Sequence, residues 1–181
     1  MRVLVPLANG VEEIEAVTII DVLRRSGLDV VGAAIGGSLT IQGSRGITLL
    51  ADALWSSLNP ADFDALALPG GGKGTEALNA DARIIQTVKA FNAAGKVIAA
   101  LCAAPTVLAT AGVLANRRAT CYPTCINQLG ESYDEAPVIA DGHIITGQGP
   151  GLSMLFALVL VQHLVGDEPA HRVAAGLLTS L

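Results

Sequence analysis

The sequence predicts a doubly wound α/β sandwich with a mainly parallel central sheet. Short apolar, β-branched runs alternate along the chain with stretches of helical spacing, and glycine or proline stands at many of the junctions. A chain of 181 residues with 51% hydrophobic and 15% charged residues can bury the core that such a fold needs. No repeat or linker divides the chain, so we expect one domain over residues 1–181.

The N-terminal part of the chain is expected to form a βαβ unit followed by a hairpin. Acidic residues stand in the first turn of its predicted helix and arginines in the last, as the helix dipole favours, and Gly27 suits the C-cap. Glycines bracket the first strand of the hairpin, and its second strand lies beyond them. We expect these elements at Val3–Leu7, Glu12–Arg25, Asp29–Ile35, and, for the hairpin, Leu39–Ile41 and Ile47–Leu50.

The β-then-α order repeats further along the chain. A second hairpin is predicted around Asp141-Gly142, and a long apolar helix comes after it. The predicted strands are Ala65–Leu68, Val97–Leu101, Val138–Ala140 and His143–Thr146, and the predicted helices are Ile84–Phe91, Ala103–Ala111 and Ser153–Val165.

Composition excludes several classes of protein. A net charge of −5 and a pI near 5.0 argue against nucleic-acid binding. The charge-free run Val97–Ala115 contains Pro105 and Gly112 and divides into a strand, a turn and a helix, so we expect no membrane span. The N-terminus lacks a secretory signal and the three cysteines are an odd number, which favours reduced thiols in the cytoplasm.

Cys102 is the candidate nucleophile. Ligands bind beyond the carboxyl ends of the strands in sheets of this type, and Cys102 directly follows the predicted strand Val97–Leu101. Small Ala103 and Ala104 permit a tight bend into the next helix, as in a nucleophile elbow. We expect the N-terminus of that helix to lower the pKa of the thiol. The alternative is that Cys102 is a small core residue.

Glu15 is the candidate proton carrier. Its helical neighbours Val11, Ile19 and Val22 are apolar, so its carboxyl is expected to face the core and to have a raised pKa. Glu12 and Glu13 are expected to form a solvated acidic turn.

No cofactor is expected. Gly70–Gly74 follows a strand and offers unobstructed backbone amides suited to an oxyanion. Gly72–Ala77 matches the G-x-G-x-x-A pattern, but no acidic residue stands about twenty positions on to bind a ribose, so NAD is not predicted.

No metal site is expected either, because Cys121 and Cys125 have no nearby histidine or second cysteine pair. Cys121 is expected to be a core thiol, with a resolving thiol as the alternative. The histidines stand outside the strand-end loops and are expected to be structural or exposed, which argues against a Cys–His–Asp hydrolase. They are His143, His163 and His171.

Five segments, taken in order, resemble the ThiJ/PfpI superfamily over essentially the whole chain. The similarity is greatest to the branch of bacterial YajL and the Parkinson-disease-associated protein deglycase. The segments are Gly10–Val17, Ser44–Gly46, Leu68–Gly71, Ala100–Pro105 and Thr146–Gly151.

This resemblance implies a flavodoxin-like sandwich, a homodimer, a reactive cysteine at Cys102 and a glutamate at Glu15 that hydrogen-bonds the thiol. Tyr122 takes the place of a histidine that is frequent in the pocket of the family, so help from a histidine base is lost. The remaining candidate residues are Gly70, Gly71 and Ala103 for oxyanion amides and Arg45 for anion binding.

The function implied by the resemblance is a cofactor-independent glyoxalase or deglycase. It would act on 2-oxoaldehydes and early glycation adducts, and would protect against carbonyl and oxidative stress. The alternative is a redox-sensing chaperone with an oxidisable Cys102 and little turnover. Peptidase activity is not expected, because Ala103 stands where the protease-like branch has histidine.

Overall fold

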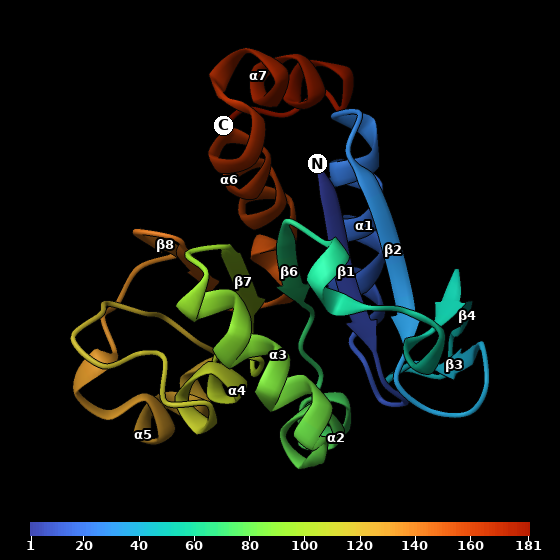
Figure 1. Cartoon of the computed structure of the whole chain (residues 1–181). Coiled ribbons are helices and arrows are strands. Elements are labelled where there is room, and N and C mark those ends of the chain that lie inside the picture. Colours follow the sequence, from blue (N-terminus) through green and yellow to red (C-terminus); the bar gives the residue numbers. More distant parts are fainter.

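A mostly parallel, seven-stranded sheet forms the centre of the computed structural model, which describes residues 1–181 (Figure 1). The strand order is β5-β2-β1-β6-β7-β9-β8, and only β8 runs antiparallel to its neighbour. The predicted doubly wound α/β fold is therefore confirmed. The strands are β1 (Arg2–Leu7), β2 (Asp29–Ala34), β3 (Thr40–Gln42), β4 (Thr48–Leu50), β5 (Ala53–Leu54), β6 (Ala65–Leu68), β7 (Val97–Leu101), β8 (Val138–Asp141) and β9 (Ile144–Gly147).

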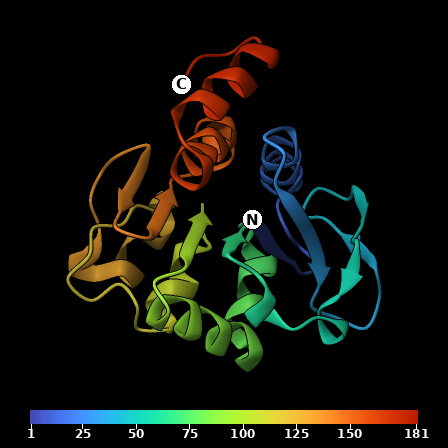
Figure 2. The ribbon, with the colours of Figure 1, turned by 45° about the horizontal axis from the view of Figure 1, so that its top comes forward.

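Helices cover both faces of the sheet (Figures 1 and 2). On one face α1 packs side by side with α6, and α7 packs against α6. On the other face α3 and α4 pack against the central strands, with α2 beside both of these helices. The helices are α1 (Glu13–Arg25), α2 (Gly72–Ala80), α3 (Ala82–Ala93), α4 (Pro105–Thr110), α5 (Ile126–Leu129), α6 (Ser153–Val165) and α7 (Asp167–Gly176).

The sheet separates two apolar cores because successive side chains of a strand point to opposite faces. In β1, Val3 and Val5 pack in the core under α1 and α6, and Leu4 packs in the core under α3 and α4. In β7, Ala99 packs in the core under α1 and α6, and Ile98 packs in the core under α3 and α4. Both faces of these strands are buried, which explains why their sequences are continuously apolar instead of alternating.

Both predicted hairpins are present. The β3–β4 hairpin is a separate two-stranded ribbon on the side of the molecule where β2 lies (Figure 2). The β8–β9 hairpin adds the single antiparallel strand to the sheet. None of the helices is both long enough and apolar enough to cross a lipid bilayer.

The segment from Gly72 to Ala80 differs from the sequence prediction, because it forms α2 where only a glycine-rich loop was predicted. Glycine disfavours helix by about 1 kcal/mol relative to alanine. Packing outweighs this preference here, since Leu78 is buried and a Cβ atom at Gly74 would lie 2.8 Å from the backbone nitrogen of Val11. Gly74 therefore serves a close approach of two backbones, which local sequence patterns do not reveal.

Candidate active site

Cys102 follows β7 in a strained backbone conformation, with φ at +63°. A left-handed conformation costs a residue other than glycine about 1 kcal/mol. Hydrogen bonds on both sides hold it in place: its nitrogen donates to the oxygen of Gly147 at 2.9 Å, and its oxygen accepts from the nitrogen of Tyr122 at 2.8 Å. The predicted sharp bend after Val97–Leu101 is thus present.

The helix after this bend is shorter than predicted. It begins at Pro105, where proline suits the first helical position, and not at Ala103. Residues 102–104 form a turn. Cys102 therefore lies three residues before a helix of only six residues, and its surroundings are set by individual backbone amides and side chains.

Glu15 projects from the first turn of α1 into the protein and is 0% exposed. Its Oε2 accepts a 2.6 Å hydrogen bond from the backbone nitrogen of Gly70, and its Oε1 is buried without a conventional hydrogen-bond partner. A Cβ atom added at Gly70 would lie 2.9 Å from both this Oε2 and the Cβ of Cys102. The carboxyl and the cysteine therefore meet across a position that only glycine can occupy.

The pKa of Glu15 is raised from 4.5 to about 7. Burial is the largest cause, since it disfavours the charged form. The hydrogen bonds from Gly70 and Cys102 act in the opposite direction, and the charge of Glu12 raises the pKa further. Near neutral pH the carboxyl can therefore exist with or without its proton, which is what a proton carrier requires.

The pKa of Cys102 is raised, so the predicted lowering is wrong. Burial is the main cause, because the residue is only 8% exposed. The charge of Glu15 and its hydrogen bond add to the effect, and the backbone amides of Ala103 and Gly71 offset part of it. The prediction relied on a helix N-terminus, and the structure instead puts the thiol beside a carboxyl in an apolar setting.

The expected oxyanion amides divide into two roles. The amide of Gly70 donates to Glu15 and holds that carboxyl in position. The amides of Gly71 and Ala103 face the sulfur of Cys102 instead. Gly71 has φ at +100° and caps α2, and a Cβ atom there would lie 2.4 Å from the oxygen of Gly10. Two of the three expected amides, those of Gly71 and Ala103, are therefore directed at the sulfur of Cys102, where an anion would form.

Arg45 and Tyr122 differ in how closely they border the site. Tyr122 borders the site, because its backbone nitrogen is hydrogen-bonded to the oxygen of Cys102. The residue is 42% exposed, and its ring lies over Gly149. Arg45 stands at the tip of the β3–β4 hairpin, where its backbone nitrogen donates to Glu13 Oε1 at 2.7 Å. Its exposed guanidinium takes part in none of the ion pairs of the molecule.

Sequence reasoning missed a cluster that joins this hairpin to α1. Glu12 and Glu13 are buried, not solvated, and the Ser44 hydroxyl lies 2.7 Å from Glu12 Oε2 and 3.0 Å from Glu13 Oε2. Burial raises the pKa of Glu13, but hydrogen bonds from its own backbone amide and from Arg45, Ser44 and Ile47 together lower it. The segment Ser44–Gly46 was noticed only as part of a family resemblance, and its contacts span more than thirty residues of chain.

Taken together, the fold and the site define an α/β protein with a cysteine in a sharp turn after a central strand and a buried carboxyl beside it. The chain belongs to the DJ-1/PfpI family, whose family profile matches residues 1–163. This confirms the resemblance drawn from the sequence.

The chain is similar to several characterised members along nearly its full length. It is 38% identical to Protein dj-1beta of Drosophila melanogaster over 98% of this chain and 96% of that protein. It is 32% identical to a protein of Pyrococcus abyssi named a deglycase, over 83% of this chain and 92% of that protein. The structure of oxidized Toxoplasma gondii DJ-1 superposes with a TM-score of 0.96 at 40% identity and covers 99% of both chains.

Proposed function

We propose that this protein is a cysteine-dependent enzyme of the glyoxalase or deglycase type, which acts on reactive 2-oxoaldehydes and early glycation adducts. The main support is the buried Glu15 carboxyl, with a pKa of about 7, beside the thiol of Cys102. The similarity to a protein named a deglycase supports the same class of substrate. The low exposure of Cys102 favours a small carbonyl group over a bulky one.

In the proposed reaction, the sulfur of Cys102 attacks the aldehyde carbon while its proton passes to the ionised Glu15. The carbonyl electron pair moves to the oxygen, and the amides of Gly71 and Ala103 stabilise the oxyanion. Glu15 then protonates this oxygen and gives a hemithioacetal. No lowered thiol pKa is required, because the thiol loses its proton only as the carbon–sulfur bond forms.

The same carboxylate next completes an internal redox step. Glu15 removes the proton of the former aldehyde carbon and passes it to the adjacent carbonyl oxygen, which gives an enediol. It then takes the hydroxyl proton of the first carbon and delivers a proton to the second carbon. The first carbon is oxidised to a thioester and the second is reduced to an alcohol. Water hydrolyses the thioester, releases a hydroxy acid and restores Cys102. An early glycation adduct would release its free amine as the carbon–nitrogen bond breaks and the aldehyde re-forms, and this aldehyde would then enter by the same addition.

A lactate assay with methylglyoxal tests this proposal. We expect Cys102→Ser to abolish turnover and Glu15→Gln to lower it by about 10²–10⁴-fold, the usual contribution of a positioned acid or base. Cys125→Ser is the matched control and is expected to retain full turnover. Undiminished lactate formation by Cys102→Ser would remove the cysteine from the mechanism.

The second candidate function is a redox-sensing chaperone in which Cys102 is oxidised in place of turning over substrate. The similarity to a structure of oxidized DJ-1 supports it, as do the amides of Gly71 and Ala103, which could hold a sulfinate. Peroxide modification of Cys102 in stoichiometric amount, with no lactate formed from methylglyoxal, would favour this candidate over the enzyme.

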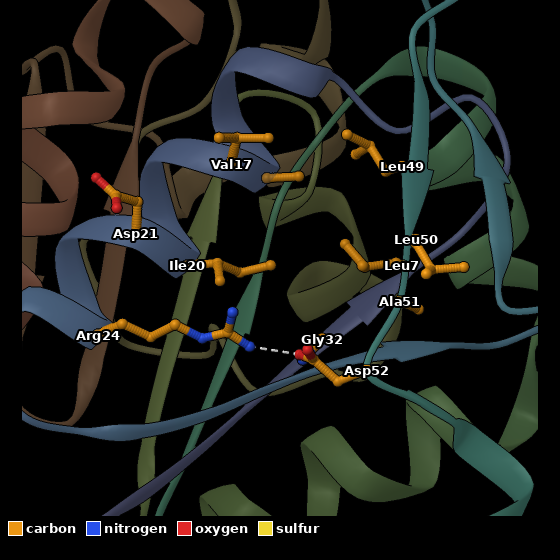
Figure 3. A pocket seen from close by; sticks show the side chains of 11 residues that line it. Leu7, Val17, Ile20, Asp21, Arg24, Gly32, Leu49, Leu50, Ala51 and Asp52 are labelled. Atoms are coloured by element: carbon orange, nitrogen blue, oxygen red, sulfur yellow. Dashed lines mark hydrogen bonds and ion pairs between the residues drawn. The ribbon is translucent and has the colours of Figure 1, made fainter.

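We also propose that the protein is a homodimer that buries the face between α1 and β4. Exposed apolar side chains stand on or next to both elements, and a groove of about 260 Å³ lies between α1 and β4, lined by Val17 and Leu50 among others (Figure 3). The charged residues at one end of the groove are already paired within the chain, as Arg24 is with Asp52. The exposed apolar residues of this face are Ile14, Val17, Ile47 and Leu50.

A second copy suits this face because a twofold contact sets the same uncharged patch against itself. The charges beside the groove are already paired within each copy, so this contact adds little to the repulsion between two copies that each carry a net charge of −5. Sedimentation measures the outcome: Leu50→Asp is expected to give monomers, and Leu178→Asp, at a site 95% exposed near the C-terminus, to leave dimers. A dimer that survives Leu50→Asp would exclude this face.

We propose the cytoplasm as the compartment of this activity. All three cysteines are free thiols, which a reducing environment preserves.

A further inference from the structure

Cys121 and Cys125 lie together in the loop between α4 and α5, outside the chemistry proposed above. A 3-10 turn, Pro123–Cys125, folds the chain back between them. It is closed by a 2.8 Å hydrogen bond from the nitrogen of Cys125 to the oxygen of Tyr122. Such a turn brings the Cα atoms of its first and fourth residues within about 7 Å, and Cys121 immediately precedes it.

Both sulfurs belong to the same apolar core. Cys121 is buried in the core under α3 and α4, and Cys125 packs against that core from a half-buried position. The pKa of Cys121 is raised to about 12, first by burial and then by the nearby Cys125. The two thiols are therefore electrostatic neighbours as well as neighbours in sequence.

Cys102 belongs to the other side of the sheet. It packs with the core under α1 and α6, whereas Cys121 packs in the opposite core. Cys125 packs against the same core as Cys121, whereas Cys102 packs with the other core, so Cys125 is the candidate partner for the resolving role considered for Cys121 from the sequence. No group of three or more His, Cys, Asp or Glu side chains is placed to hold a metal ion, so the pair does not belong to a metal site of that kind.

We propose that Cys121 and Cys125 are a second redox site, which closes to a reversible disulfide when the protein meets a peroxide. The turn that leads directly from Cys121 to Cys125, their shared core and their unequal exposure support this assignment. The half-buried Cys125 can be reached by a small oxidant, whereas Cys121 is 0% exposed and is shielded from it.

The chemistry balances in two steps. Hydrogen peroxide oxidises Cys125 to a sulfenic acid, its O–O bond breaks, and one water is released. The sulfur of Cys121 then attacks the sulfur of Cys125, the S–O bond breaks, and the departing hydroxide leaves as water with the proton of Cys121. A thiol reductant reverses the bond by exchange.

The turn that follows Cys121 and contains Cys125 is hydrogen-bonded to the candidate active site. The backbone oxygen of Tyr122 accepts a hydrogen bond from the nitrogen of Cys125, and the backbone N–H of Tyr122 donates one to the oxygen of Cys102. Drawing Cys121 and Cys125 together displaces the backbone of Tyr122, because the disulfide fixes both ends of a short loop around it. We therefore expect the disulfide to change the reactivity of Cys102 across this bond.

Peptide mapping tests the proposal because trypsin separates the thiols. Cleavage after Lys96, Arg117, Arg118 and Arg172 places Cys102 alone in residues 97–117 and the pair together in residues 119–172. After dilute hydrogen peroxide and alkylation of the remaining thiols, we expect peptide 119–172 to lose two hydrogens and to carry no alkyl group. A thiol reductant should restore both thiols, and Cys125→Ser should prevent the loss while Cys121 is still alkylated on unfolding.

Three results would overturn the proposal. Cys125 could reach the sulfinic acid while Cys121 stays a thiol, or peptides 97–117 and 119–172 could be cross-linked, or two copies of peptide 119–172 could be joined to each other. The coupling to Cys102 is tested separately by its rate of alkylation with iodoacetamide in the dithiol and disulfide forms. We expect a change of at least about twofold, and equal rates would refute the coupling. Neither measurement uses enzymatic turnover, so this proposal and the proposed reaction can fail independently.

Discussion

Replacing Glu15 with Gln should change how the stability of the protein depends on pH. The pKa of this carboxyl is about 7 in the folded protein, compared with 4.5 ordinarily. The folded state therefore binds the proton more tightly than the unfolded chain does, and this contribution to stability is complete below pH 4.5 and is lost as the pH rises through 7. Glutamine keeps the shape of the side chain and has no proton to lose.

The size of the effect follows from the two pKa values. Each tenfold change in proton affinity is worth about 1.4 kcal/mol, so the full contribution is about 3 kcal/mol, and about 2–3 kcal/mol of it is lost between pH 5 and pH 8. Because Glu15 is 0% exposed, solvent does not screen this difference. We expect the free energy of unfolding of Glu15→Gln, relative to wild type, to rise by that amount from pH 5 to pH 8.

Urea unfolding at a fixed protein concentration measures this difference. The single tryptophan, Trp55, is 4% exposed and reports unfolding by its fluorescence. Glu76→Gln, which changes an exposed glutamate of α2, is the matched control and should follow the wild-type curve. If the difference between Glu15→Gln and wild type stays constant from pH 5 to pH 8, the carboxyl does not hold a proton near neutrality and its proposed role as proton carrier is refuted.

Three further predictions follow from the same site. Turnover of methylglyoxal should rise as the pH passes about 7, because Glu15 must be ionised to accept the thiol proton, and a rate that falls over that range contradicts this role. Gly70→Ala should lower the free energy of unfolding by about 1–3 kcal/mol, because the added Cβ crowds three neighbouring atoms. The control Gly36→Ala adds a Cβ in open space and should change this free energy by less than about 0.5 kcal/mol. Urea unfolding measures both. Ser44→Ala should lower the free energy of unfolding by about 1–3 kcal/mol in the same assay, because two buried carboxyls lose their shared hydroxyl donor. The control Ser56→Ala removes an exposed serine. An equal loss of stability in both variants would show that the cluster does not stabilise the hairpin.

The architecture could be predicted because it depends on local patterns. The strands Ala65–Leu68 and Val97–Leu101 and the helix Ser153–Val165 occur with the predicted boundaries, since apolar runs and their breakers mark them in the sequence. The helix α2 could not be predicted, because its glycines are needed for contact with a loop sixty residues away. Local preference and tertiary packing disagree at that segment, and packing prevails.

The sequence by itself determined the alternation of the main strands and helices, the position of Cys102 at the end of a strand and the inward direction of Glu15. Periodicity and chain direction are enough for these, because both are properties of neighbouring residues. Only the tertiary structure decided that the amide of Gly70 binds Glu15, that the pKa of Cys102 is raised and that Glu12 lies buried beneath the hairpin. Desolvation and hydrogen bonding depend on which distant segments fold against a group, and no local pattern of residues contains that information.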